Sequence, residues 1–110
     1  MTYTEIATMV ASMGFSYAYY SFPEAQAPAL PYVLFYFPNT NNFNADDSVY
    51  QKVEALNIEL YTSNKDYTSE AAVEAALAAN GVPWEKSETY LTTENMYEVL
   101  YQMEVIINGE

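Results

Sequence analysis

Histidine, cysteine and arginine are absent from this 110-residue sequence, and lysine occurs only three times. Without cysteine the chain has no disulfide, no thiolate metal site and no cysteine nucleophile. Without histidine it lacks the usual general base at neutral pH and the commonest metal ligand in proteins. Any chemistry is therefore left to carboxylates, hydroxyls and amides.

The chain has three lysines and fifteen aspartates and glutamates, so its formal net charge is −12. Proteins that bind a nucleic-acid backbone use lysine and arginine to displace its counterions, and anionic membrane surfaces attract the same residues. We therefore expect no direct nucleic-acid binding and no membrane association. No apolar run approaches the roughly 18 residues of a membrane span.

Length and patterning predict one domain over residues 1–110 with two helices. The first begins at a capping box formed by Thr2 and Glu5 and ends near Gly14. Its apolar stripe consists of Ile6, Met9, Val10 and Met13. The second, an alanine-rich helix, spans Ser69–Asn80 and stops at Gly81.

Five segments are rich in aromatic and β-branched residues or alternate between apolar and polar, which predicts strands. They are Phe15–Phe22, Tyr32–Phe37, Val49–Thr62 with a break near Ala55–Asn57, Trp84–Leu91 and Met96–Asn108. The order α-β-β-β-α-β-β predicts an α+β fold, with two helices packed on one face of a mostly antiparallel sheet. Asn39–Asp47, with four asparagines and two aspartates, is predicted to be a polar loop.

Paired carboxylates are the only candidate catalytic groups. Asp46 with Asp47, or Glu85 with Glu88, supply the acid and base that glycoside hydrolysis requires. Acidic residues in loops and on strand edges are more often solvated, and no base, nucleophile and oxyanion donors assemble from the residues present. We expect no enzymatic activity.

A cation site made of carboxylates is a second chemical alternative, with Asp46, Asp47 and Asp66 as its candidate ligands. The segment has no glycine and no D-x-[DN]-x-[DN]-G run, so it is not an EF-hand loop. Plain surface charge is the favoured interpretation, and we expect neither a metal nor a cofactor.

Twelve tyrosines are the most informative feature of the composition. Strand propensity explains most of them, since the majority fall in predicted strands. Tyrosine is also favoured at protein interfaces, because it covers apolar area and keeps a hydrogen-bonding tip. The composition is typical of a subunit that recognises other proteins.

The order of several motifs along the chain resembles one protein family. These motifs are YVLFYFPNTNNF at residues 32–43, Ala45–Tyr50, Ile58–Thr62 with Lys65 and Asp66, Glu70 with Val73, Glu74 and Leu77, Glu88–Tyr90, and Met96–Tyr101. Over roughly residues 30–105 they are similar to the small tail-completion, or tail-terminator, proteins of long-tailed phages and prophages of Gram-positive bacteria. None of the motifs is a catalytic signature, so the specificity lies in their order.

The resemblance implies a virion protein at the head-proximal end of the tail, present in the host cytoplasm during assembly. Such proteins form a ring, commonly a hexamer, that caps the tail tube and contributes to head–tail joining. The implied partners are the tail tube protein and a head-completion or connector protein, and DNA passes through the ring. The missing arginine is a departure, because only Lys52, Lys65 and Lys86 remain for ion pairs between subunits. Apolar and backbone contacts are therefore expected to dominate the ring.

The family pattern extends over Asp46, Asp47 and Tyr50, next to the polar loop and its Phe43. The predicted interface residues are Asn39, Asn41, Asn42, Phe43, Asp46, Asp47 and Tyr50.

The alternative function is an acidic DNA mimic that inhibits a host DNA-binding enzyme. Charge and size fit this function. Such a protein is expected to align its carboxylates in one stripe at phosphate-like spacing, whereas these are scattered over predicted helix ends, loops and strands.

Overall fold

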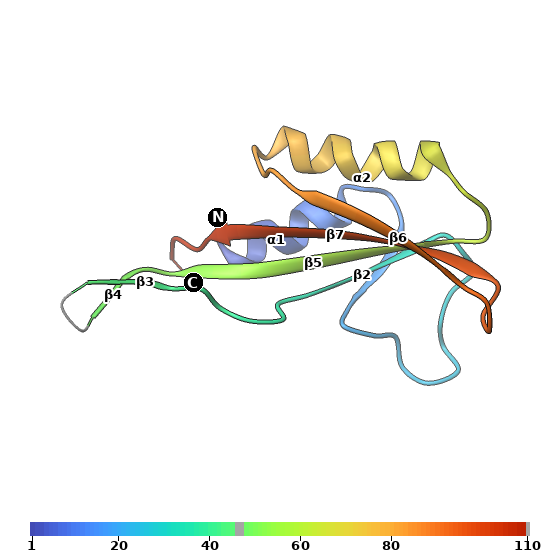
Figure 1. Cartoon of the computed structure of the whole chain (residues 1–110), viewed down its shortest axis with the longest axis horizontal. Coiled ribbons are helices and arrows are strands. Elements are labelled where there is room, and N and C mark those ends of the chain that lie inside the picture. The colour runs from blue at the N-terminus through green and yellow to red at the C-terminus, as the bar shows by residue number, and fades with distance from the viewer. Residues whose placement is uncertain (46–47, 110) are drawn as a thin grey trace.

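The computed structural model describes residues 1–45 and 48–109, with the backbone alone at 43–45 and 48–50. These residues form two helices, a five-stranded sheet and a separate two-stranded ribbon (Figure 1). In chain order the elements are α1 (Tyr3–Ala11), β1 (Ser16–Tyr19), β2 (Tyr32–Tyr36), β3 (Phe43–Ala45), β4 (Ser48–Gln51), β5 (Val53–Thr62), α2 (Tyr67–Ala79), β6 (Glu85–Leu91) and β7 (Met96–Ile106).

The strand order across the sheet is β1-β2-β5-β7-β6. All neighbouring strands are antiparallel except β1 and β2, which run parallel. The long strands β5 and β7 form the centre and pair from Val53 opposite Ile106 to Thr62 opposite Tyr97. The predicted α+β class is confirmed, as is the order of the two helices and the five sheet strands.

Two predictions about residues 39–62 are wrong in detail. Part of the predicted loop forms β3, which pairs with β4 as the antiparallel ribbon. The chain leaves the strand conformation at Lys52 and not at Ala55–Asn57, where β5 is continuous. Asn57 is tolerated inside β5 because its side-chain amide donates to the Tyr36 hydroxyl at 3.2 Å.

The first helix begins and packs as its sequence predicts. The Thr2 hydroxyl accepts from the backbone N–H of Glu5 at 3.0 Å, and the Glu5 carboxylate accepts from the N–H of Thr2 at 2.8 Å. This reciprocal pair satisfies two N–H groups that a helix start otherwise leaves free. Ile6, Met9 and Val10 then lie buried against the sheet.

The second helix starts two residues before the predicted Ser69. Its N-cap is Asp66, whose carboxylate accepts from the backbone N–H of Ser69 at 3.0 Å and from its hydroxyl at 2.8 Å. The hydrogen bond from the Ser69 backbone holds the pKa of Asp66 below its ordinary value. Asp66 therefore acts as a helix cap, which explains its charge without a bound cation.

The core lies between the helices and one face of the sheet, because alternate residues of the central strands are buried there. The sheet contributes Val33, Phe35, Leu56, Ile58, Leu60, Val99, Tyr101, Met103 and Val105, and α2 contributes Val73 and Leu77. Val99, Tyr101, Met103 and Val105 form the apolar face of β7.

Tyr101 is the largest fully buried side chain and ties the core to an ion-pair network. Its hydroxyl donates to Glu74 at 2.9 Å, and Lys86 contacts the same carboxylate at 2.7 Å. The hydrogen bond from Lys86 is the main cause that lowers the pKa of Glu74. Burial, followed by the Glu74 contact, raises the pKa of the Tyr101 hydroxyl. The network fixes α2 to β6 and β7.

The molecule is elongated, with principal extents of 50 × 29 × 22 Å and a radius of gyration of 15.0 Å. A compact chain of this length has a radius of gyration of about 13 Å. Figure 1 shows the reason: the β3–β4 ribbon extends beyond the layer of helices at one end of the long axis. No helix within the described residues has the length and apolar character needed to cross a membrane.

Removing the Tyr101 hydroxyl tests the link between the core and the ion-pair network. We expect Tyr101→Phe to lower the free energy of unfolding by about 2 kcal/mol, since the ring stays in place and one hydrogen bond to a charged group is lost. Urea denaturation measures this difference. Tyr90→Phe, at an exposed position on β6, is the matched control and should change it by less than about 0.5 kcal/mol. Equal effects at the two positions would contradict the network.

Candidate protein interface

The segment before the ribbon runs along the edge of β5 and is held by backbone hydrogen bonds. The N–H of Asn41 donates to the carbonyl of Val53, and the N–H of Ala55 donates to the carbonyl of Asn39, both at 2.9 Å. Two asparagine side chains add to this ladder. Asn41 donates to Glu104 at 2.6 Å, and Asn42 accepts from the N–H of Val53 at 3.1 Å. This segment is therefore a firm base for the ribbon.

The predicted interface residues are distributed over this base and the ribbon that follows it. Asn39 and Asn41 are exposed and Asn42 is half-buried. Phe43 opens β3 and Tyr50 lies in β4, while Asp46 and Asp47 lie outside the described residues. Except for the last two, the predicted residues share the projecting end of the molecule. Their contact with a partner stays a prediction.

The sheet face that points away from both helices, called here the helix-free face, carries an aromatic cluster. Its rings contact one another in pairs: Tyr32 lies 5.2 Å from both Phe22 and Tyr61, and Tyr20 lies 5.1 Å from Tyr36, measured between ring centroids. The β2 and β5 residues of this face are only half-buried. Aromatic area that is partly exposed and ends in hydroxyl groups is typical of protein interfaces.

Two carboxylates, Glu59 and Glu98, lie within this face and share one hydroxyl. Tyr61 is 2.8 Å from an oxygen of Glu59 and 3.2 Å from an oxygen of Glu98, yet it carries a single hydrogen. Tyr36 donates to the other oxygen of Glu59 at 3.0 Å. Burial, and then the charge of Glu59, raise the pKa of Glu98. The Glu98 carboxyl therefore takes up a proton at higher pH than an ordinary glutamate does.

The three lysines lie beside the helices, on the other side of the sheet. The Lys52 ammonium lies 5.2 Å from the ring centre of Tyr3 in α1. Lys65 and Lys86 both contact Glu70 of α2, at 2.6 and 3.1 Å. Glu59 and Glu98 of the helix-free face therefore have tyrosine hydroxyls, and not lysines, as hydrogen-bond partners.

Of the carboxylates that the sequence suggested for catalysis, Glu85 and Glu88 do not form a pair. On β6, Glu85 is opposite Gln102 and Glu88 is opposite Val99, so the two glutamates point to opposite faces of the sheet. Among residues 1–45 and 48–109 no three acidic side chains gather as a metal site requires. The candidates Asp46 and Asp47 fall outside the described part of the chain.

Sequence reasoning missed the carboxylates of the helix-free face. The sequence does show one glutamate in each of two otherwise apolar strands, Glu59 within Ile58–Thr62 and Glu98 within Met96–Tyr101. Strand alternation places both on one face, but it does not give the pairing between the strands. The observed register puts Tyr61 opposite Glu98, which brings the hydroxyl between the two carboxyl groups.

A similar fold occurs in a chain of the solved structure described as "Virion of native gene transfer agent (GTA) particle". The two chains match with a TM-score of 0.64 over 94% of this chain and 86% of that chain, at 14% sequence identity. The likeness therefore concerns the fold of nearly the whole chain. No protein-family model matches the sequence, and no curated protein matches it either.

The carboxyl pair predicts a pH-dependent difference between the protein and Glu98→Gln. A carboxyl whose pKa is raised by folding contributes stability that is full below its unfolded pKa of about 4.3 and is lost as pH rises through the folded value. We expect Glu98→Gln to match the parent near pH 4 and to be more stable at pH 8, by up to about 1 kcal/mol because solvent screens this half-buried pair.

Urea denaturation of dilute protein between pH 4 and pH 8 measures this difference. Glu24→Gln, an exposed residue between β1 and β2, is the matched control and should differ from the parent by the same small amount at both ends of the range. A Glu98→Gln variant that is less stable than the parent at pH 8 would show that the two carboxyl groups do not repel each other.

Proposed function

We propose that this chain is a phage virion assembly protein that caps the tail tube and contributes to head–tail joining. It acts through protein–protein contacts, without catalysis or a cofactor, as a hexameric ring at the head-proximal end of the tail. Its partners are the tail tube protein and a head-completion or connector protein. DNA passes through the ring and is not bound, because each copy carries a net charge of −12.

The observation that carries this proposal is the likeness over 94% of the chain to a chain of a gene transfer agent virion. A match of that extent covers nearly the whole chain, so the comparison rests on more than a common motif. The motif order of the sequence points independently to tail-completion proteins. Together they support a structural role in a tailed particle.

The surfaces of the protein also suit this role. The ribbon projects from one end of a 50 Å molecule, where it can reach beyond the body to a neighbouring subunit. The helix-free face offers half-buried tyrosines, and the lysines are engaged on the helix side. A ring built from such subunits closes through apolar and backbone contacts more than through ion pairs.

The DNA-mimic alternative has less support from the structure. Glu70 and Glu74 are engaged by lysines, and Glu54 is buried beneath α1, where one of its oxygens accepts from the Tyr3 hydroxyl. These carboxylates are therefore not displayed as a row of phosphate-like charges. Inhibition of a host endonuclease by stoichiometric amounts of the protein would restore this alternative.

Electron microscopy of particles made without the protein tests the proposal. We expect overlong tail tubes without heads, because nothing stops polymerisation of the tube or joins it to the head. Supplying the chain from a plasmid should restore tails of normal length. Tails of normal length that join heads in the absence of the protein would overturn the proposal.

Ring formation should strengthen as salt increases. Each subunit adds twelve negative charges to the ring, and their mutual repulsion is screened within about 10 Å at 0.1 M salt and about 3 Å at 1 M. Sedimentation of the purified protein, with and without tail tubes, measures the fraction in rings between these salt concentrations. A ring fraction that falls as salt rises would show that attraction between charges holds the ring together.

Replacing residues 43–50 by a short glycine-serine linker tests the ribbon as an interface. Phe43 is paired with Gln51, so a few residues span the gap and the sheet stays intact. We expect unchanged stability in urea and an at least tenfold loss of joined particles, about 1.4 kcal/mol or more of lost contact energy. Ala71→Ser, on the exposed side of α2, is the control. Normal joining with the linker would remove the ribbon as an interface.

A further inference from the structure

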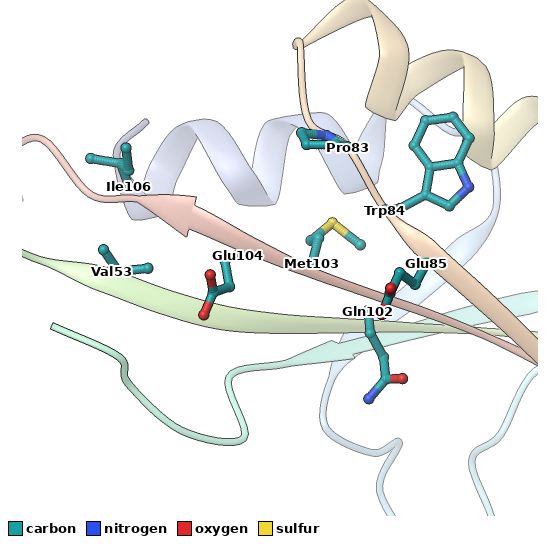
Figure 2. A pocket seen from close by; sticks show the side chains of 8 residues that line it. All are labelled: Val53, Pro83, Trp84, Glu85, Gln102, Met103, Glu104 and Ile106. Atoms are coloured by element: carbon teal, nitrogen blue, oxygen red, sulfur yellow. The ribbon is translucent and has the colours of Figure 1, made fainter. Parts of the chain in front are cut away.

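The last strand is longer than its neighbour on one side, so part of its edge is open. β6 pairs with β7 only as far as Glu85 opposite Gln102, whereas β5 pairs with β7 up to Val53 opposite Ile106. The stretch Met103–Ile106 therefore has a strand on one side only. Figure 2 shows the chain before β6 diverging from β7 at Glu85 and rising toward α2.

The direction of the backbone groups on this edge follows from strand alternation. The N–H of Ile107 donates to the carbonyl of Lys52, so odd-numbered residues here face β5 and even-numbered residues face the open side. At the far end Met1 closes the edge: its amino group donates to the carbonyl of Ile106 at 2.8 Å, and its own carbonyl accepts from Asn108.

Glu104 is the residue of β7 whose backbone groups face the open side of the strand. The register of β6 would place Pro83 opposite it, and proline has no N–H to donate. Within the described residues no backbone hydrogen bond joins Glu104 to Pro83. The N–H and C=O of Glu104 and the N–H of Ile106 are therefore turned toward an unoccupied strand position, the usual template for adding a strand.

A groove of about 670 Å³ occupies this strand position (Figure 2). Its walls include Pro83, Trp84 and Glu85 on one side and Gln102, Glu104 and Ile106 on the other. At about 3.3 Å per residue, the open stretch of β7 accommodates an extended segment of about four residues. The groove thus has the length and the backbone groups that one short strand requires.

The side chains of the groove define the chemistry of its occupant. Glu104 and Ile106 point to the same face two residues apart, and Ile106 is 49% exposed. One oxygen of the exposed Glu104 carboxylate accepts from the Asn41 amide at 2.6 Å, and within the described residues the negative charge of the group is not paired with a lysine of the chain. A strand beside them presents a side chain opposite each, so a cation opposite Glu104 and an apolar group opposite Ile106 complement the edge. Glu85 adds a second negative charge on the same face, since it is opposite Gln102.

A second copy of this chain cannot supply that cation. Lys65 and Lys86 are engaged with carboxylates of their own chain, Lys52 lies over Tyr3, and the chain has no arginine. Charge complementarity therefore selects a different protein with a basic segment.

We propose that the open edge of β7 at Glu104 and Ile106 is a docking site for an extended basic segment of a partner protein. The segment adds a strand antiparallel to β7, in line with β6. It presents lysine or arginine to Glu104 and an apolar residue to Ile106, with one residue between them. This site depends on the strand edge alone, so it stands or falls separately from the tail-capping function.

A blocked hexapeptide in which lysine and valine alternate with threonine is the probe. The indole of Trp84 points toward α2 (Figure 2), so the NMR signals of the Glu104 and Ile106 amides report occupancy. We expect saturable binding in 0.15 M salt, with slowing of amide exchange at Glu104 and Ile106 by about tenfold or more in NMR spectra. A peptide with glutamate in place of lysine should not bind.

Two controls separate strand addition from general attraction to an acidic protein. N-methylation of the lysine and valine amides of the peptide blocks the hydrogen bonds to β7 and should abolish binding. Glu104→Gln should weaken binding about threefold to fivefold, the size expected of an exposed ion pair, while Glu24→Gln, outside the groove, should leave it unchanged.

Several results would overturn the proposal. They are equal binding of the N-methylated peptide, unchanged exchange at Glu104 and Ile106, equal effects of the two glutamine substitutions, or no shift of the Glu104 and Ile106 amide signals at about 1 mM peptide. Protection of the Glu104 amide that rises with protein concentration in the absence of peptide would identify a second copy as the occupant and would also overturn it.

Discussion

The distribution of three lysines among fifteen carboxylates governs this structure. Lys65 and Lys86 converge on Glu70, which is buried where α2 meets the sheet, and Lys86 extends the network to Glu74 beneath the Tyr101 hydroxyl. A buried carboxylate without such partners would be costly, so these lysines are needed where they are. They fix α2 over the core, and they leave the far side of the sheet without a cation of its own.

Because the lysines lie on the helix side, the carboxylates elsewhere on the surface have other partners. On the helix-free face, the hydroxyls of Tyr36 and Tyr61 replace cations as partners of Glu59, and burial together with the charge of Glu59 raises the pKa of Glu98. Tyrosine serves two purposes there, because its ring covers the sheet while its hydroxyl satisfies a carboxylate. The same shortage of cations makes the Glu104 edge of β7 complementary to a basic partner and not to another copy. The proposed ring and the proposed docking site thus use different contacts, aromatic and backbone in one case and charge-complementary in the other.

Much of the fold could be predicted because local rules and tertiary structure agree. The Thr2 capping box predicts where α1 begins. The apolar stripe of α1 and the alternation of β7 predict which of their residues are buried. The break expected at Ala55–Asn57 was wrong because Asn57 finds a partner in Tyr36, on a strand distant in sequence. The carboxyl pair and the open edge depend on register between strands, which alternation alone does not fix. Pairings between segments that are far apart in the chain could therefore not be predicted from the sequence.

The most direct measurement is a cryo-electron microscopy reconstruction of the head-proximal end of the tail in virions that contain this chain. The proposed function predicts a closed ring of copies between tube and head, with the ribbon of each copy against a neighbouring subunit. The helix-free face should be covered, and the lysine-bearing side of α2 should keep its internal ion pairs. Density for this chain elsewhere in the particle, or its absence from purified virions, would contradict that role.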